Sequence, residues 1–178
     1  MEEMNGWMLI LAILIPVLGL VGIVYVILTQ YFDNQRQQQL DEWRAKKTKE
    51  YIPLQVQAYE RFILYLERIS PERLVFRVNK PGMSARQLQT DMLAIIRDEF
   101  DHNLAQQLYV SPQAWDGINA AREETVKLLN VAAERVDKNA DSFTFATAIL
   151  EVVGQLKKLP TEVAVGLLKA EFRKKMNE

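Results

Sequence analysis

The first feature of the chain is an apolar run of 26 residues, from Trp7 to Phe32, that is rich in Leu, Ile and Val and contains no charged side chain. As an α-helix this run would be about 39 Å long, more than the roughly 30 Å of hydrocarbon in a bilayer. Trp7 at one end, and Tyr31 with Phe32 at the other, are residue types enriched at membrane interfaces. The pattern therefore predicts a transmembrane helix over residues 7–32, preceded by a short tail, residues 1–6.

Two other structures produce apolar runs near an amino terminus, namely a buried core helix and a cleaved signal peptide. A core helix rarely extends this far without a charge. A signal peptide has a basic first region and a small-residue cleavage site, whereas this chain begins Met1-Glu2-Glu3-Met4 and has no Ala-x-Ala after the run. A retained span is favoured. Gly19 and Gly22 lie one turn apart but do not form GxxxG, so pairing of two spans through them is the less favoured alternative.

The distribution of basic residues predicts the orientation of the span. No Lys or Arg precedes it, whereas Arg36, Arg44, Lys46, Lys47 and Lys49 follow it closely. Lys and Arg residues flanking a span stay on the cytoplasmic side. We therefore expect a single-pass protein of the plasma membrane, with its amino terminus outside and its carboxy-terminal domain in the cytoplasm.

A polar stretch of good helix formers, residues 33–52, follows the span and is predicted to be a helical stalk. It contains no Gly or Pro, so the membrane helix can continue through it. Leu40 and Trp43 lie on one face and are candidate contacts for the domain, for a second stalk or for the membrane surface; the first two are favoured. Pro53 is expected to break the helix, because the residue before a proline is displaced from the α region.

Beyond Pro53, apolar residues recur mainly at helical spacing. A helix is predicted from Leu54 to Ile69, and the run Leu74–Asn79 is β-like but too short for a sheet. Three further helices are predicted to begin after Ser84, Ser111 and Asp141 or Ser142, where hydroxyl or carboxylate groups can cap them, and a last one after Thr161. The expected bounds are 84–108, 112–138, 142–158 and 162–176, and the expected inward-facing positions include Leu54, Leu104, Leu108, Leu156 and Val163.

The fold class that follows is all-α: an N-terminal transmembrane helix, a helical stalk and a soluble bundle of about five helices over residues 53–178. The expected connections are short, as in helical bundles. No repeat of 34 or 40 residues is present, and the helix lengths are uneven, so a closed bundle is favoured over a solenoid.

Charge and cysteine content exclude several classes of function. Because Glu2 and Glu3 precede the apolar run, the remainder of the chain carries 22 basic and 21 acidic residues. That balance argues against a nucleic-acid partner, which would require a basic surface. The chain has no cysteine. A disulfide scaffold, an iron–sulfur cluster, a thiolate zinc site and cysteine catalysis are therefore excluded.

The stretch Arg97–Asn103 contains the only histidine and the best candidate for chemistry, a polar cluster of Asp98, Glu99 and His102. Glu99-x-x-His102 has the spacing found in di-iron bundles, but such a site needs two of these motifs. Asp98 and His102 are four residues apart, so a helix-surface pair is favoured over a metal site. The serines stand at helix starts, and no glycine-rich nucleotide loop is present. We therefore assign no catalytic, metal-binding or cofactor-binding residue.

Two stretches, Leu54–Ile69 (LQVQAYERFILYLERI) and Pro81–Ser111 (PGMSARQLQ through RDEFDHNLAQQLYVS), carry a family resemblance. There the chain resembles an uncharacterised bacterial family of single-pass membrane proteins with a domain of unknown function. The resemblance extends over most of the chain and implies an amino-terminal anchor, in a bacterial inner membrane, and a helical cytoplasmic domain. It implies no activity, ligand or catalytic residue.

These observations predict a non-enzymatic, membrane-tethered helical module that contacts the lipid bilayer and binds a protein partner or a second copy of itself. One alternative is a metal- or ligand-dependent enzyme that uses Asp98, Glu99 and His102. A third hypothesis is an envelope scaffold that senses the bilayer through Leu40 and Trp43 of its stalk.

Overall fold

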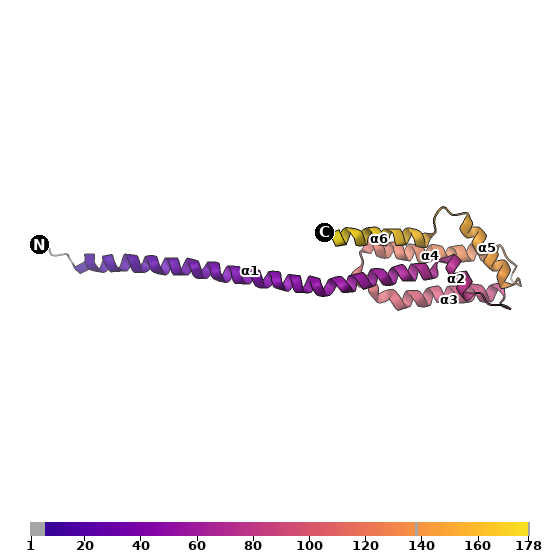
Figure 1. Ribbon diagram of the computed structural model, residues 1–178, viewed down its shortest axis with the longest axis horizontal. Helices are drawn as coiled ribbons and strands as arrows, with labels where there is room; N and C mark the ends of the chain where they lie inside the picture. Colours follow the sequence, from indigo (N-terminus) through magenta and orange to yellow (C-terminus); the bar gives the residue numbers. More distant parts are fainter. Residues whose placement is uncertain (1–5, 138, 178) are drawn as a thin grey trace. The chain divides into compact units, whose positions relative to one another are not determined.

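The computed structural model describes residues 6–137 and 139–177. Over this described part the chain forms helices and no β-strand, which confirms the all-α prediction (Figure 1). The elements are α1 (Gly6–Ile69), α2 (Pro71–Val78), α3 (Ala85–Asn103), the 3₁₀ helix η1 (Leu104–Tyr109), α4 (Pro112–Glu134), α5 (Ser142–Gly154) and α6 (Pro160–Asn177). Contacts divide the chain into two compact units, with the boundary between Tyr51 and Ile52.

The first unit consists of the amino-terminal part of α1. Its described apolar side chains between Ile10 and Phe32 are all exposed, so the protein itself provides no core for them. The segment Leu14–Trp43 is long and apolar enough to cross a membrane, by length and composition. The helix also continues without interruption through residues 33–51, as the sequence predicts.

The expected helix break at Pro53 is wrong, because α1 runs through this residue to Ile69. Proline cannot donate the backbone hydrogen bond that the carbonyl of Lys49 would accept in a regular helix. Pro53 is exposed, as are Tyr51 and Ile52. Water can therefore satisfy the carbonyl, and the helix is maintained at a local cost in free energy.

The second unit begins with the remainder of α1, which is followed by α2 where the sequence suggests a β-like run. Pro71, Leu74, Val75 and Val78 are the buried residues of α2. Their spacing of three, four and seven residues is that of one helical face. The β-like interpretation of this segment is therefore wrong, since burial of that face outweighs the strand preference of valine and phenylalanine.

The predicted capping residues are confirmed at three helix starts. Ser84 Oγ accepts a hydrogen bond from the Gln87 N–H at 3.2 Å, and Gln87 Oε1 accepts one from the Ser84 N–H at 2.9 Å, which completes the capping box of α3. Ser111 Oγ accepts from the Ala114 N–H at 3.1 Å, and Asp141 Oδ1 accepts from the Thr144 N–H at 2.8 Å. Between α2 and α3, Gly82 has a φ of 83°, a conformation that favours glycine.

Four predicted helix boundaries differ from the structure, and one of them is the end of α5, which lies at Gly154 instead of residue 158. The helix expected to reach Leu108 ends at Asn103 and continues as η1, which has no buried residue. The next helix ends at Glu134, and its expected last residue, Lys138, lies outside the described residues. The last helix begins at Pro160, two residues before the expected start at Glu162, and Glu162 Oε2 accepts a hydrogen bond from the Leu159 N–H at 3.1 Å at this end.

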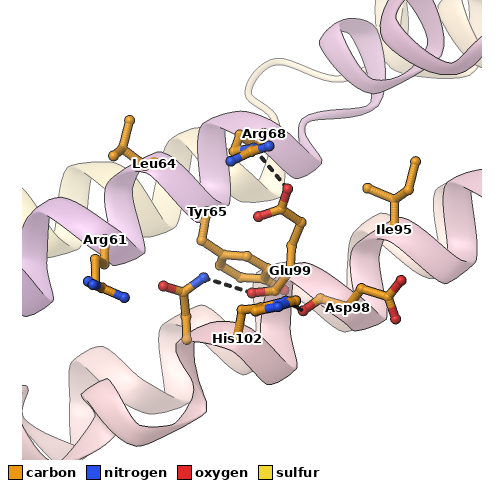
Figure 2. A pocket seen from close by; sticks show the side chains of 9 residues that line it. Arg61, Leu64, Tyr65, Arg68, Ile95, Asp98, Glu99 and His102 are labelled. Atoms are coloured by element: carbon orange, nitrogen blue, oxygen red, sulfur yellow. Dashed lines mark hydrogen bonds and ion pairs between the residues drawn. The ribbon is translucent and has the colours of Figure 1, made fainter.

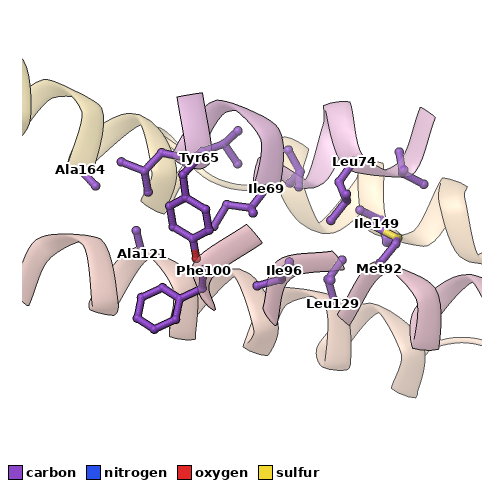
Figure 3. Close-up of a cluster of buried hydrophobic side chains, with 14 of the residues drawn as sticks. Tyr65, Ile69, Leu74, Met92, Ile96, Phe100, Ala121, Leu129, Ile149 and Ala164 are labelled. Atoms are coloured by element: carbon purple, nitrogen blue, oxygen red, sulfur yellow. The ribbon is translucent and has the colours of Figure 1, made fainter. Parts of the chain in front are cut away.

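The core of the second unit is formed by apolar faces of α1 to α6 (Figure 3). Fully buried residues from each helix, such as Leu66, Leu74, Met92, Leu129, Ile149 and Leu168, meet there. Not every residue that the sequence places inward joins them. Leu54, Leu104, Leu108, Leu156 and Val163 are exposed, with Leu108 at 75%. Leu104 and Leu108 belong to η1, Leu156 follows the end of α5, and Val163 is in the first turn of α6. Leu54 lies within α1, next to the boundary between the two units.

Candidate functional site: the groove between α1 and α3

A groove of about 570 Å³ separates the second half of α1 from α3, and we call it the α1–α3 groove (Figure 2). It is lined by Arg61, Leu64, Tyr65 and Arg68 from α1 and by Ile95, Asp98, Glu99, His102 and Asn103 from α3. Within each helix these residues recur three or four positions apart, and they therefore share one face. The sequence-predicted polar cluster thus lies in a concave surface of the bundle.

An ion pair crosses the groove between the two helices. Arg68 Nε lies 2.9 Å from Glu99 Oε1, with the arginine side chain 57% exposed and the glutamate side chain 18% exposed (Figure 2). Asn103 Nδ2 donates to the backbone carbonyl of Glu99 at 2.7 Å. Glu99 is therefore held by its neighbours in the fold, with its charge matched by Arg68.

His102 does not pair with the carboxylate of Asp98. Its Nδ1 lies 2.7 Å from the backbone carbonyl oxygen of Asp98, which only accepts hydrogen bonds, so Nδ1 carries the proton and donates (Figure 2). Among the described residues, no three His, Asp or Glu side chains are grouped so that they could hold a metal ion. Asp98, Glu99 and His102 share the groove, but the metal-dependent alternative gains no support from their geometry.

Tyr65 forms the floor of the groove and joins it to the core. Its ring lies 6.0 Å from that of Phe100, which stacks on Trp115 at 5.5 Å. The guanidinium of Arg122 sits 4.0 Å from the centre of the Phe100 ring, a cation–π contact. The groove therefore has a rigid aromatic base.

The hydroxyl of Tyr65 is buried and has no hydrogen-bond partner among the described residues. Burial raises the pKa of this hydroxyl, and the nearby charge of Arg122 opposes the rise only in part. Tyr65 therefore remains protonated at neutral pH and is unsuited to act as a base.

The two walls of the groove differ in charge. Arg61 and Arg68 stand on the α1 wall, and Asp98 and Glu99 stand on the α3 wall. Between the two arginines, the side chain of Leu64 is 61% exposed. The edge of the groove therefore carries one apolar side chain with a basic residue on either side of it.

The other sequence-predicted residues lie in the first unit. Tyr31 and Phe32 are exposed, and their rings meet edge to face with centres 6.0 Å apart. Leu40 is 51% and Trp43 58% exposed, so the contact expected of them stays a prediction. Trp7 belongs to α1, but its side chain lies outside the described residues.

Sequence reasoning missed a polar cluster around Glu171, which we call the Glu171 node. Ser111 donates to this carboxylate twice, from Oγ to Oε2 at 2.5 Å and from its backbone N–H to Oε1 at 3.2 Å. The Tyr59 hydroxyl also donates to Oε1, and Lys175 Nζ lies 3.5 Å from it. The node thus links α1, the start of α4 and α6.

The electrostatic effects on Glu171 oppose one another. Burial acts to raise the pKa of its carboxyl group, but the hydrogen bonds from Ser111 and Tyr59, together with the charge of Lys175, hold the pKa below its usual value. No spacing in the sequence joins positions 59, 111 and 171. Only the capping role of Ser111 marks one member in advance.

A family model described as a family of unknown function, DUF7935, matches residues 5–175. The chain belongs to DUF7935. No curated protein and no solved structure matches it. The DUF7935 match spans both units, and the expected resemblance to a family of unknown function is confirmed. The description of DUF7935 gives neither a bacterial source nor a membrane anchor, so both remain predictions for this chain.

Proposed function

We propose that the chain is a non-enzymatic protein-interaction module tethered to a membrane, with the α1–α3 groove as its docking face. One observation supports the tether: the described apolar side chains from Leu14 to Phe32 are exposed, in a segment long and apolar enough to cross a membrane. Apolar surface in water costs about 25 cal/mol per Å², and insertion into lipid removes that cost.

The orientation proposed for the tether follows from the basic residues after the span. Arg36, Lys46 and Lys49 are among five Lys or Arg residues that follow it closely, and none precedes it. With these residues in the cytoplasm, the second unit faces the cytosol and the amino terminus lies outside. The location that we propose is the plasma membrane, crossed once, and the resemblance described above favours a bacterial inner membrane.

The docking face is proposed from the exposure and chemistry of the groove. Leu64 offers an apolar side chain at its edge, while Arg61 and Asp98 offer charges of both signs beside it. Apolar contact would provide affinity, and the charges would select the orientation of the partner. A membrane tether raises the effective concentration of any partner in the same membrane, so modest contacts suffice for binding.

Affinity purification with a matched pair of variants tests this proposal. The full chain, solubilised in mild detergent from its native cells, should retain a bound protein, and Leu64→Asp should release it. Val163→Asp is the control, since Val163 is similarly exposed, at 58%, but lies on α6 away from the groove. Recovery of the bait alone as a monomer, or equal loss from both variants, would contradict the proposal.

A further inference from the structure

Two contacts show which residues of α1 lie opposite which residues of α3 and η1. Arg68 is paired with Glu99 near one end, and Gln55 Nε2 donates to the carbonyl of Tyr109, 3.4 Å away, near the other. As residue numbers increase along α1, the residues opposite them in the other helix have decreasing numbers. The two helices therefore run antiparallel. Asp98, next to Glu99, lies at about the level of Arg68.

The opposite charge of the two walls makes the groove complementary to itself. A two-fold rotation about an axis along the groove places the basic α1 wall of one copy against the acidic α3 wall of the other. The symmetry creates this contact twice, once with each copy providing the basic wall. An interface between identical subunits related by such an axis must be self-complementary in this way. Any other partner would need the same pattern of charges, whereas a second copy already has it.

We propose that the occupant of the α1–α3 groove is a second copy of this chain, in a two-fold symmetric dimer; this inference rests on the proposed docking function. Arg68 of one copy faces Asp98 of the other, and Leu64 lies near the axis against the second copy's Leu64, at the level of His102 and Asn103. With the axis parallel to residues 52–69 of α1, the two chains enter their second units from the same side of the dimer, as two tethers in one membrane require. Confinement in the membrane compensates for the small area of such an interface.

Because the chain has no cysteine, a single introduced cysteine reports on this interface without background. Leu64→Cys and the matched control Val163→Cys are reconstituted as full chains in phosphatidylcholine vesicles at low protein density and treated with a short bismaleimide. We expect at least tenfold more cross-linked dimer for Leu64→Cys. Equal cross-linking of both variants would indicate random collision, and failure of Leu64→Cys to cross-link would remove the groove from any dimer; either result overturns the proposal.

Charge reversal tests the arrangement of the walls. In the Leu64→Cys background, Arg68→Glu alone and Asp98→Arg alone should each lower the cross-linked fraction several-fold, because each puts like charges across the interface twice. A mixture of the two variants should restore it, with cross-links between unlike chains, because both contacts then pair opposite charges. Restoration also shows that each variant is folded. A mixture no better than its components contradicts the proposed geometry.

The same cysteine separates this inference from the proposed function. Cross-linking of Leu64→Cys in native membranes to a different polypeptide, together with no rescue in the charge-reversal mixture, would leave the docking function standing and overturn the second copy as the occupant. Absence of any cross-linked product from Leu64→Cys, in vesicles and in native membranes alike, would overturn both.

Discussion

Glu171 illustrates how one side chain can join three parts of the fold. Its carboxylate accepts hydrogen bonds from Ser111 and Tyr59 and is paired with Lys175. The same groups hold its pKa below the ordinary value. A carboxyl group whose pKa is lower in the folded than in the unfolded state stabilises the fold above its unfolded pKa, and this contribution is lost as the pH falls.

The first prediction concerns this pH dependence. Glu171→Gln keeps an oxygen that can accept hydrogen bonds but removes the charge. We expect the wild-type free energy of unfolding to fall as the pH drops through the unfolded glutamate pKa of about 4.3 toward the lower folded value, and the variant to show a shallower decrease. Denaturant titrations between about pH 6 and pH 3, followed by near-ultraviolet circular dichroism, measure both curves. Glu151→Gln, on the exposed face of α5, is the control for removal of one charge; parallel curves for wild type and Glu171→Gln would contradict the prediction.

A second prediction at this scale compares two leucines on the same helix. Leu66 is fully buried in the core, whereas Leu64, two residues earlier, is 61% exposed. Leu66→Ala should lower the free energy of unfolding by about 2–5 kcal/mol, because it removes buried methyl groups and leaves a cavity. Leu64→Ala should change it by less than about 0.5 kcal/mol. Denaturant unfolding of the two variants measures both changes. A large loss in the free energy of unfolding for Leu64→Ala would mean that this residue stabilises the fold and is not reserved for a partner.

At the scale of elements, the sequence predicts most helix starts because their signals are local. Ser84, Ser111 and Asp141 each cap a helix within three residues, so the interaction can be recognised without knowledge of the fold. Segments whose structure depends on distant neighbours were less predictable. α2 forms because the core covers its face, and η1 remains exposed because nothing covers Leu108.

The candidate site was predictable to the same limited extent. Asp98, Glu99 and His102 are neighbours on one helix, so spacing alone identifies them as a cluster. Leu64 and Arg68 belong to a helix about thirty residues earlier, and hydrophobic periodicity does not say which helices lie side by side. Glu171 could not be predicted for the same reason, since its partners come from α1 and the start of α4.

The third prediction concerns Pro53, where the chain continues a helix against its local preference. Pro53→Ala supplies the missing backbone donor to the carbonyl of Lys49 and removes the steric clash of the ring, a change worth up to about 3 kcal/mol in a helix interior. We expect amide hydrogen exchange of residues 49–57 to slow, with little change in α3 and α4. Gln57→Ala, at an exposed position of the same helix, is the control for a new alanine. Unchanged exchange around position 53 would show that the proline does not weaken α1.

At the scale of the whole molecule, the two units differ in what stabilises them. All buried hydrophobic residues of the described part lie between Ala58 and Leu168, whereas the described apolar side chains of the first unit are exposed. The fourth prediction is therefore that residues 52–178 fold alone and unfold in one cooperative transition, since the core is complete without the first unit. Scanning calorimetry of that fragment gives the result directly. Aggregation, or a broad transition without a heat-absorption peak, would indicate that the first unit supports the core.

The fifth prediction concerns the membrane itself and separates a retained span from a cleaved signal sequence. A span that keeps its apolar segment in lipid resists extraction by alkaline carbonate, whereas a cleaved chain would be shorter and soluble. The absence of native cysteine allows the orientation to be measured with single substitutions. Glu3→Cys should react with a membrane-impermeant maleimide on intact cells, and Val163→Cys should react only after lysis, if the basic residues after the span hold the second unit in the cytoplasm as we propose. Labelling of Val163→Cys on intact cells would reverse the orientation, and release of the full-length chain by carbonate would remove the tether on which the proposed concentration effect depends.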